Sequence, residues 1–76
     1  MTVYAMFTYC VDSDANPVGD SSIRVFDTPQ KAIAAVDETE TWWKECKYKV
    51  ARKGPYVLIR KDEPLYICEV RETEME

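Results

Sequence analysis

The chain has 76 residues, of which 46% are apolar and 32% charged, and its formal net charge is −4 at pH 7. This size and composition predict one globular domain, residues 1–76, rather than a disordered chain. No apolar run is long enough to cross a bilayer, and residues 1–10 lack the basic start of a signal peptide. We therefore expect a cytoplasmic protein without a membrane partner.

The first half of the chain predicts two strands and the start of a helix. Residues 3–11 alternate with a period of two and are rich in aromatic and β-branched types, which favours a strand. Turn-forming residues at 12–20 predict a loop, and residues 21–26 predict a second, antiparallel strand. Thr28 and Pro29 mark a helix start, because Thr caps free backbone N–H groups and Pro has no N–H to leave unpaired.

The predicted helix carries an apolar stripe at helical spacing, formed by Ala32, Ile33, Val36 and Trp43. Glu40 interrupts the stripe and is spaced from Lys44 for an i,i+4 ion pair. We expect the helix to end near residues 43–45. Neighbouring helical residues point about 100° apart, so Trp43 is expected to pack inward and Trp42 to stay at the edge. Trp42 is then either a binding residue or a ring lying over the sheet rim beside Tyr48.

The second half predicts strands at residues 56–61 and 65–71, with turns before each at residues 53–55 and 62–64. Residues 47–52 are a candidate for an additional strand. The acidic tail, residues 72–76, is expected to fray. The predicted fold class is α+β: an antiparallel four- or five-stranded sheet with one helix packed on one face, in β-β-α-β-β order.

Residue types that carry catalysis or bind metals are scarce. The chain has no histidine, and its two glycines, Gly19 and Gly54, are not part of a phosphate-binding motif. Three cysteines are far apart in sequence, without a C-x-x-C pair: Cys10, Cys46 and Cys68. We expect them to be buried apolar residues, with one exposed thiol or an interchain disulfide as alternatives. No catalytic, cofactor or metal site is predicted, so we do not expect an enzyme.

Charge is distributed unevenly along the chain. Residues 44–61 carry seven bases and one acid, whereas residues 1–43 carry seven acids and two bases, and residues 62–76 six acids and one base. The basic segment offers a possible nucleic-acid surface, made of Lys47, Lys49, Arg52, Lys53, Arg60 and Lys61 with Tyr48 and Tyr56. Because the whole chain is acidic, direct nucleic-acid binding is the less favoured hypothesis.

The acidic residues support a second hypothesis. They are Asp12, Asp14, Asp20, Asp27, Asp37, Glu38 and Glu40, and together they are candidates for a surface that imitates a phosphate backbone and attracts a basic groove. The alternative is structural, with basic and acidic side chains paired across neighbouring strands. Under that alternative Arg60 or Lys61 pairs with Glu69 or Glu72, and each pair contributes about 0.2–1 kcal/mol.

The amount of apolar sheet surface exceeds what one helix covers. Both sets of side chains in residues 3–11 are apolar or aromatic, and so are both sets in residues 65–70. Antiparallel sheets with one wet face normally carry polar residues on it. A second apolar face indicates a cover, which is a second copy of the chain, another partner, or the loops and tail, unless its Tyr and Thr side chains simply tolerate partial exposure.

A strand, an acidic loop, a second strand and then V-F-D-T-P-Q-K-A-I opening a helix at residues 25–33 resemble the layout of small phage-encoded proteins, among them anti-CRISPR proteins. The resemblance implies a non-enzymatic inhibitor that blocks a nucleic-acid-binding or partner surface of a host defence complex, a host protein or ribonucleoprotein. The alternatives are a small module that binds nucleic acid through residues 47–61 and a regulatory homodimer joined through the open sheet face. The candidate partner-binding residues are Asp12, Asp14, Asp20, Asp37, Glu38, Glu40, Trp42, Lys49, Arg52, Lys53 and Tyr56.

Overall fold

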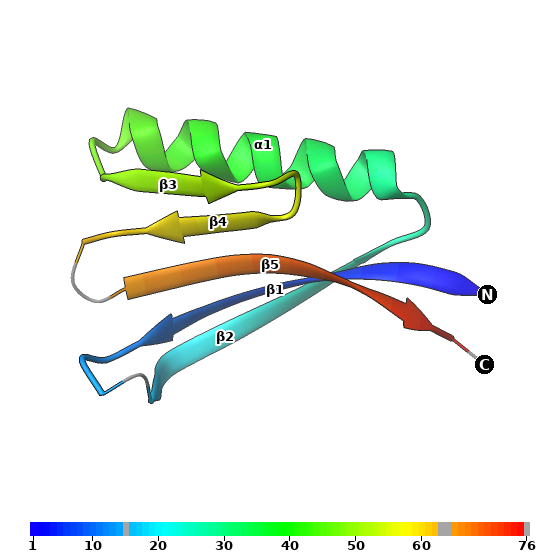
Figure 1. The fold of residues 1–76 in the computed structure, drawn as a ribbon, viewed down its shortest axis with the longest axis horizontal. Helices are drawn as coiled ribbons and strands as arrows, with labels where there is room; N and C mark the ends of the chain where they lie inside the picture. The colour runs from blue at the N-terminus through cyan, green and yellow to red at the C-terminus, as the bar shows by residue number, and fades with distance from the viewer. Residues whose placement is uncertain (15, 63–64, 76) are drawn as a thin grey trace.

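The computed structural model describes residues 1–14, 16–62 and 65–75 and consists of one antiparallel sheet and one helix (Figure 1). The strands are β1 (Thr2–Val11), β2 (Pro17–Phe26), β3 (Val50–Lys53), β4 (Val57–Arg60) and β5 (Leu65–Glu74). They lie in the order β2-β1-β5-β4-β3, and every pairing is antiparallel. The helix α1 (Pro29–Glu45) contacts β1, β2, β3 and β4. The predicted α+β class is confirmed, and the candidate additional strand forms at Val50–Lys53.

The additional strand begins at Val50 instead of residue 47, because the turn at Lys47 precedes it. Two other predicted boundaries are wrong where a neighbouring strand supplies a partner. β2 begins at Pro17 instead of residue 21, because a bulge with Gly19 at φ 72° lets the turn-forming segment pair with the end of β1. β5 continues to Glu74, so the expected frayed tail is wrong for residues 72–74, which pair with Tyr4, Val3 and Thr2. Of the other predicted segments, the turn at 62–64 and the tail include residues 63, 64 and 76, which lie outside the described chain.

The helix begins and ends as local chemistry dictates. Thr28 Oγ1 accepts a hydrogen bond from the Lys31 N–H at 3.2 Å, and Pro29 occupies the first turn. At the other end, the N–H of Cys46 donates to Trp42 O and that of Tyr48 to Trp43 O. Lys47 adopts φ 65°, the left-handed conformation that turns the chain out of the helix and towards β3.

The main core lies between α1 and the sheet. It contains buried side chains from the helix and three strands: Met6, Ala35, Val36, Trp43, Leu58 and Cys68. Trp43 meets the ring of Tyr66 edge-on, with centroids 6.4 Å apart. Cys10 and Cys68 are buried as predicted, whereas Cys46, just after the helix, is exposed. Burial raises the pKa of the Cys68 thiol.

Candidate binding surfaces

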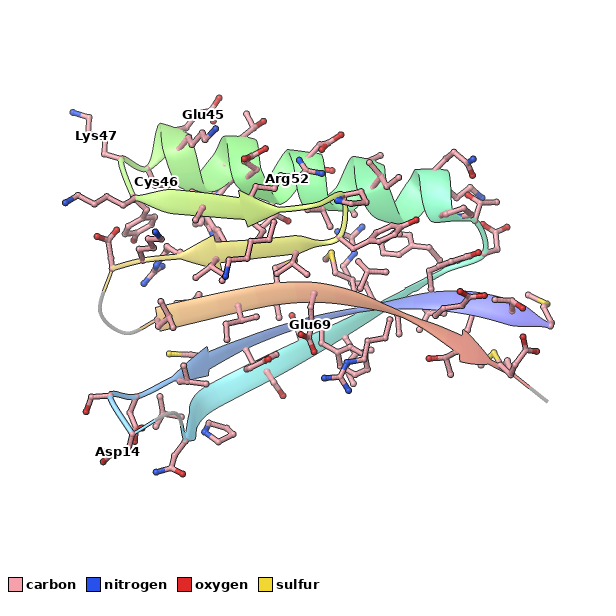
Figure 2. The ribbon with its side chains drawn as sticks, in the orientation of Figure 1. Asp14, Glu45, Cys46, Lys47, Arg52 and Glu69 are labelled. Carbon is pink, nitrogen blue, oxygen red and sulfur yellow. The ribbon has the colours of Figure 1, made fainter. Side chains whose placement is uncertain are left out.

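The predicted partner contacts lie in separate parts of the molecule. Asp12 and Asp14 belong to the β1–β2 connection, which Figure 2 shows at the opposite side of the molecule from α1. The helical candidates are Asp37, Glu38, Glu40 and Trp42, and those around β3 are Lys49, Arg52, Lys53 and Tyr56. Asp20 belongs to β2, and its side chain lies outside the described structure. The described acidic side chains therefore do not gather into the single surface proposed for loop and helix.

Asp12 holds its own loop. Its Oδ1 accepts hydrogen bonds from the N–H of Asp14 at 2.9 Å and of Asn16 at 3.0 Å, while its N–H donates to Asn16 O. An aspartate that satisfies following backbone N–H groups stabilises a turn. These hydrogen bonds account for Asp12 without requiring a binding partner. Asp14 is exposed on the same loop.

Arg52 connects β3 to the helix. Its Nη1 donates to Asp37 and, at 3.0 Å, to Glu40, and the other guanidinium nitrogens donate to the carbonyls of Gly54 and Pro55. The neighbouring Asp37 carboxylate, followed by that of Glu40, raises the pKa of Arg52 against the opposing effect of burial. The guanidinium of Arg52 is thus engaged in contacts within the fold. The same contacts explain why Glu40 interrupts the apolar stripe of α1.

Arg60 is also held within the fold. Its guanidinium lies between two rings, 4.0 Å from the centroid of Tyr48 and 4.1 Å from that of Tyr66. This stacking is a favourable cation–π arrangement. Its Nε is buried and has no hydrogen-bond partner among the described residues. The predicted nucleic-acid surface therefore has both of its arginines packed internally.

The predicted pairing of Arg60 or Lys61 with Glu69 or Glu72 is absent from the described ion pairs. The register gives the reason for Arg60: it lies opposite Tyr66, whereas Glu69 lies opposite Val57, on the other face of the sheet. Glu69 instead pairs with Arg71, whose Nε donates to it at 2.9 Å. The predicted helical pair is present, with Lys44 Nζ 3.4 Å from a Glu40 oxygen.

The exposed side of α1 carries a tryptophan. We call this the outer face of α1 and define it by Glu38, Thr41, Trp42 and Glu45, all of them exposed. As predicted, Trp43 is buried and Trp42 is not: 5% of Trp43 and 58% of Trp42 is accessible. Glu38 and Glu45 lie four residues before and three after Trp42, so both flank its ring on the helix surface. Neither carboxylate belongs to an ion pair in the described structure.

Of the lysines, Lys49 and Lys53 are exposed at opposite ends of β3, and Tyr56 is half-buried in the following turn. Lys47 and Lys61 are exposed as well, and the N–H of Lys61 donates to Lys49 O, so the lysines of the predicted basic-aromatic surface stay accessible while its two arginines do not. Glu45 is not among the residues predicted from sequence, although its three-residue spacing from Trp42 on a helix is a signal for it.

The sheet face opposite α1 is predominantly apolar. β1 contributes Val3, Ala5, Phe7, Tyr9 and Val11 to it, because the alternate residue Met6 packs in the helix-covered core. Directly paired residues share a face, which adds Ile23, Val25, Val57, Ile59, Leu65 and Ile67. We call these eleven residues, together with Glu69 and Arg71, the open face. The sequence-based expectation that both sheet faces are apolar is confirmed.

The open face is unevenly covered. The β1 residues Val3, Ala5 and Val11 are buried, since β1 lies between β2 and β5 and side chains from both flank it. Towards the β2 edge, Ile23 is 61% and Val25 54% exposed. Two neighbouring β-branched residues left in water on one strand are a candidate contact surface rather than scattered apolar exposure.

Comparisons with protein-family models, curated proteins and solved structures found no match to this chain. Within the residues that the structure describes, no helix has the length and hydrophobicity needed to span a membrane. The same residues include no group of three His, Cys, Asp or Glu side chains placed to hold a metal ion. The outer face of α1 and the open face are thus the two candidate binding surfaces.

Proposed function

We propose that this chain is a non-enzymatic binding protein of the inhibitor type, which uses the outer face of α1 to dock onto a host protein or ribonucleoprotein complex in the host cytosol. The observation that carries the proposal is Trp42, 58% exposed on a regular helix and flanked by two carboxylates without described ion-pair partners. Tryptophan is enriched at binding hot spots, where it fills a pocket on the partner.

The flanking charges indicate what kind of partner this surface fits. Glu38 and Glu45 would meet lysine or arginine side chains around the pocket that receives Trp42. Basic side chains surrounding an apolar or aromatic pocket are typical of grooves that bind single-stranded nucleic acid. A chain bound there excludes the nucleic acid, which is the inhibitory action inferred from the resemblance to small phage-encoded inhibitors.

The ion pairs of the fold distinguish Glu38 and Glu45 from the other acidic residues of α1. Asp37 and Glu40 are engaged with Arg52, and Glu40 also with Lys44, so these acids are partly neutralised. The negative field near Trp42 then comes mainly from Glu38 and Glu45. Of the acidic candidates on α1 predicted from sequence, Glu38 is therefore the one proposed as a direct contact.

The test is quantitative capture from host lysate with the tagged chain, followed by measurement of nucleic-acid binding by the captured complex. We expect Trp42→Ala to reduce recovery of the partner by about tenfold or more, as hot-spot truncations do. Glu38→Gln and Glu45→Gln are expected to slow association and to weaken its salt dependence. Gln30→Ala, exposed on the same helix about three turns away, is the matched control.

Two results would contradict the proposal. The first is equal recovery of the partner by the wild-type chain and Trp42→Ala. The second is a captured complex that still binds its nucleic acid with unchanged affinity. A gel shift of nucleic acid by the purified chain alone, lost on neutralising Lys49 and Lys53, would instead support the direct nucleic-acid-binding alternative.

A further inference from the structure

We infer that the open face is covered by a second copy of this chain, packed sheet against sheet about a two-fold axis. The two sheets would then form the inside of a four-layer assembly, with one α1 on each outer side. This inference goes beyond the proposed function, because the outer face of α1 stays accessible in both copies.

The charges on the open face favour a second copy over an unrelated partner. Glu69 and Arg71 are two residues apart in β5, so both point to this face, and Arg71 Nε donates to Glu69 at 2.9 Å. The Arg71 guanidinium also lies 5.5 Å from the centroid of the Phe7 ring. Glu69 is labelled in Figure 2. One positive and one negative side chain thus stand side by side among the apolar residues of this face, and Lys53, opposite Val57, lies on the same side at the β3 edge.

A two-fold axis makes such a pair self-complementary. In an isologous interface the same patch meets itself, so Glu69 of each copy faces Arg71 of its partner and the reverse contact follows by symmetry. Neither Glu69 nor Arg71 is then buried without an opposite charge, so their attraction offsets part of the cost of taking both groups out of water. Ile23 and Val25, the most exposed apolar residues of the face, would be removed from water in both copies.

The size of the face is sufficient for such a contact. β1, β2 and β5 have 10 residues each, and β3 and β4 have four each. With strands about 4.8 Å apart and a rise of about 3.3 Å per residue, the face covers about 600 Å². Contact over the whole face would cover at most about 1,200 Å² in total on two copies, at the lower end of the range for stable interfaces. The expected dimer is therefore concentration-dependent rather than obligate.

The first test is sedimentation equilibrium of the purified full chain over a series of concentrations, with reductant present so that exposed Cys46 forms no interchain disulfide. We expect a mass rising from 8.8 kDa towards twice that value. Ile23→Lys should raise the dimer dissociation constant by about tenfold or more, because it places a charge in an apolar contact. Ser22→Lys is the matched control, since Ser22 is exposed on the neighbouring position and points to the other face.

The second test exchanges the charges. Glu69→Arg and Arg71→Glu, each alone, should dimerise more weakly, because two like charges then face two like charges. An equimolar mixture of the two variants should form a heterodimer, since each face is complementary to the other. Restored association also shows that both variants are folded.

Several outcomes would overturn the inference. They are a wild-type chain that stays at 8.8 kDa at the highest soluble concentration, a dimer that Ile23→Lys leaves intact, and single charge variants whose mixture does not associate. If the open face instead binds an unrelated protein, the purified chain stays monomeric. That result counts against a second copy. None of these results depends on Trp42, so the proposed function is tested separately.

Discussion

Arg52 in β3 donates a hydrogen bond from Nη1 to Oε1 of Glu40 in α1, at 3.0 Å, and joins the helix to an edge strand. Both side chains are largely shielded from water, with 23% and 20% of their surfaces accessible. The second carboxylate on the same nitrogen, that of Asp37, is more exposed, with 57% of its side chain accessible to water. The helix is therefore attached to the sheet by charge near β3 and by apolar packing elsewhere.

Removing this connection should weaken the fold. We expect Arg52→Met to lower the free energy of unfolding by about 1–2 kcal/mol, since a partly buried hydrogen bond to a charged group is lost and Glu40 is left without that partner. Urea unfolding followed by circular dichroism measures this. Lys53→Met, an exposed position in the same strand, should change it by less than about 0.5 kcal/mol. Equal effects of the two substitutions would show that Arg52 contributes nothing specific.

The two tryptophans should differ sharply in their effect on stability. Trp43→Ala is expected to cost about 3–5 kcal/mol, because it leaves a cavity beside Val36 and removes the contact with Tyr66. Trp42→Ala should change stability by no more than about 0.5 kcal/mol, since its ring is exposed. Thermal unfolding of both variants checks this. A large loss for Trp42→Ala would mean that its effect on partner capture reports unfolding rather than contact.

Thiol reactivity should separate the three cysteines. Cys46 is exposed and is expected to react with a thiol reagent at the rate of a free peptide, whereas Cys10 and Cys68 are buried and should react only on unfolding. For Cys68 burial also raises the thiol pKa, which makes the reactive thiolate scarce in the folded state. Mass spectrometry of peptides after brief labelling measures each site. Early labelling of Cys68 would contradict the described core.

The raised pKa of Cys68 has a consequence for pH dependence. Above about pH 8.5 the thiol ionises in the unfolded chain before it does so in the folded one, so stability is retained below this pH and lost as pH rises further. Urea unfolding at neutral and alkaline pH checks the direction. Cys68→Ala should show a smaller alkaline loss than the wild type, and an equal loss would assign the effect to other groups.

The C-terminal residues should contribute to stability because β5 reaches Glu74. A chain shortened after Arg71 loses the pairing of residues 72–74 with β1, the bond from Thr2 to Glu74 and that from the Met75 N–H to Met1 O. We expect a loss of about 1–3 kcal/mol from these exposed bonds. A chain shortened after Met75 is the control. Unchanged stability after the longer truncation would restore the prediction of a frayed tail.

The loop aspartates offer a further comparison. Asp12→Ala should cost about 0.5–1.5 kcal/mol, because the N–H groups of Asp14 and Asn16 lose their acceptor. Asp14→Ala should be close to neutral, since its side chain is exposed and accepts none of the described hydrogen bonds. Urea unfolding of both variants decides whether Asp12 is needed for the turn.

The sequence by itself determined the parts of this protein that depend on local periodicity. The alternation in residues 3–11, the Thr28–Pro29 start and the spacing of the helical stripe predicted strand, helix and the inward side of Trp43. Alternation also predicted an apolar face opposite the helix, because the side-chain period of a strand assigns each residue to one face wherever the strand lies.

Only the tertiary structure decided which charged residues are available to a partner. No local signal indicates that Arg52 pairs with Glu40, 12 residues away, or that Arg60 stacks between rings from two other segments. The extension of β5 and the bulge at Gly19 likewise depend on backbone groups of β1 that need partners. Long-range pairing sets these features, and composition along the chain does not contain the register that produces it.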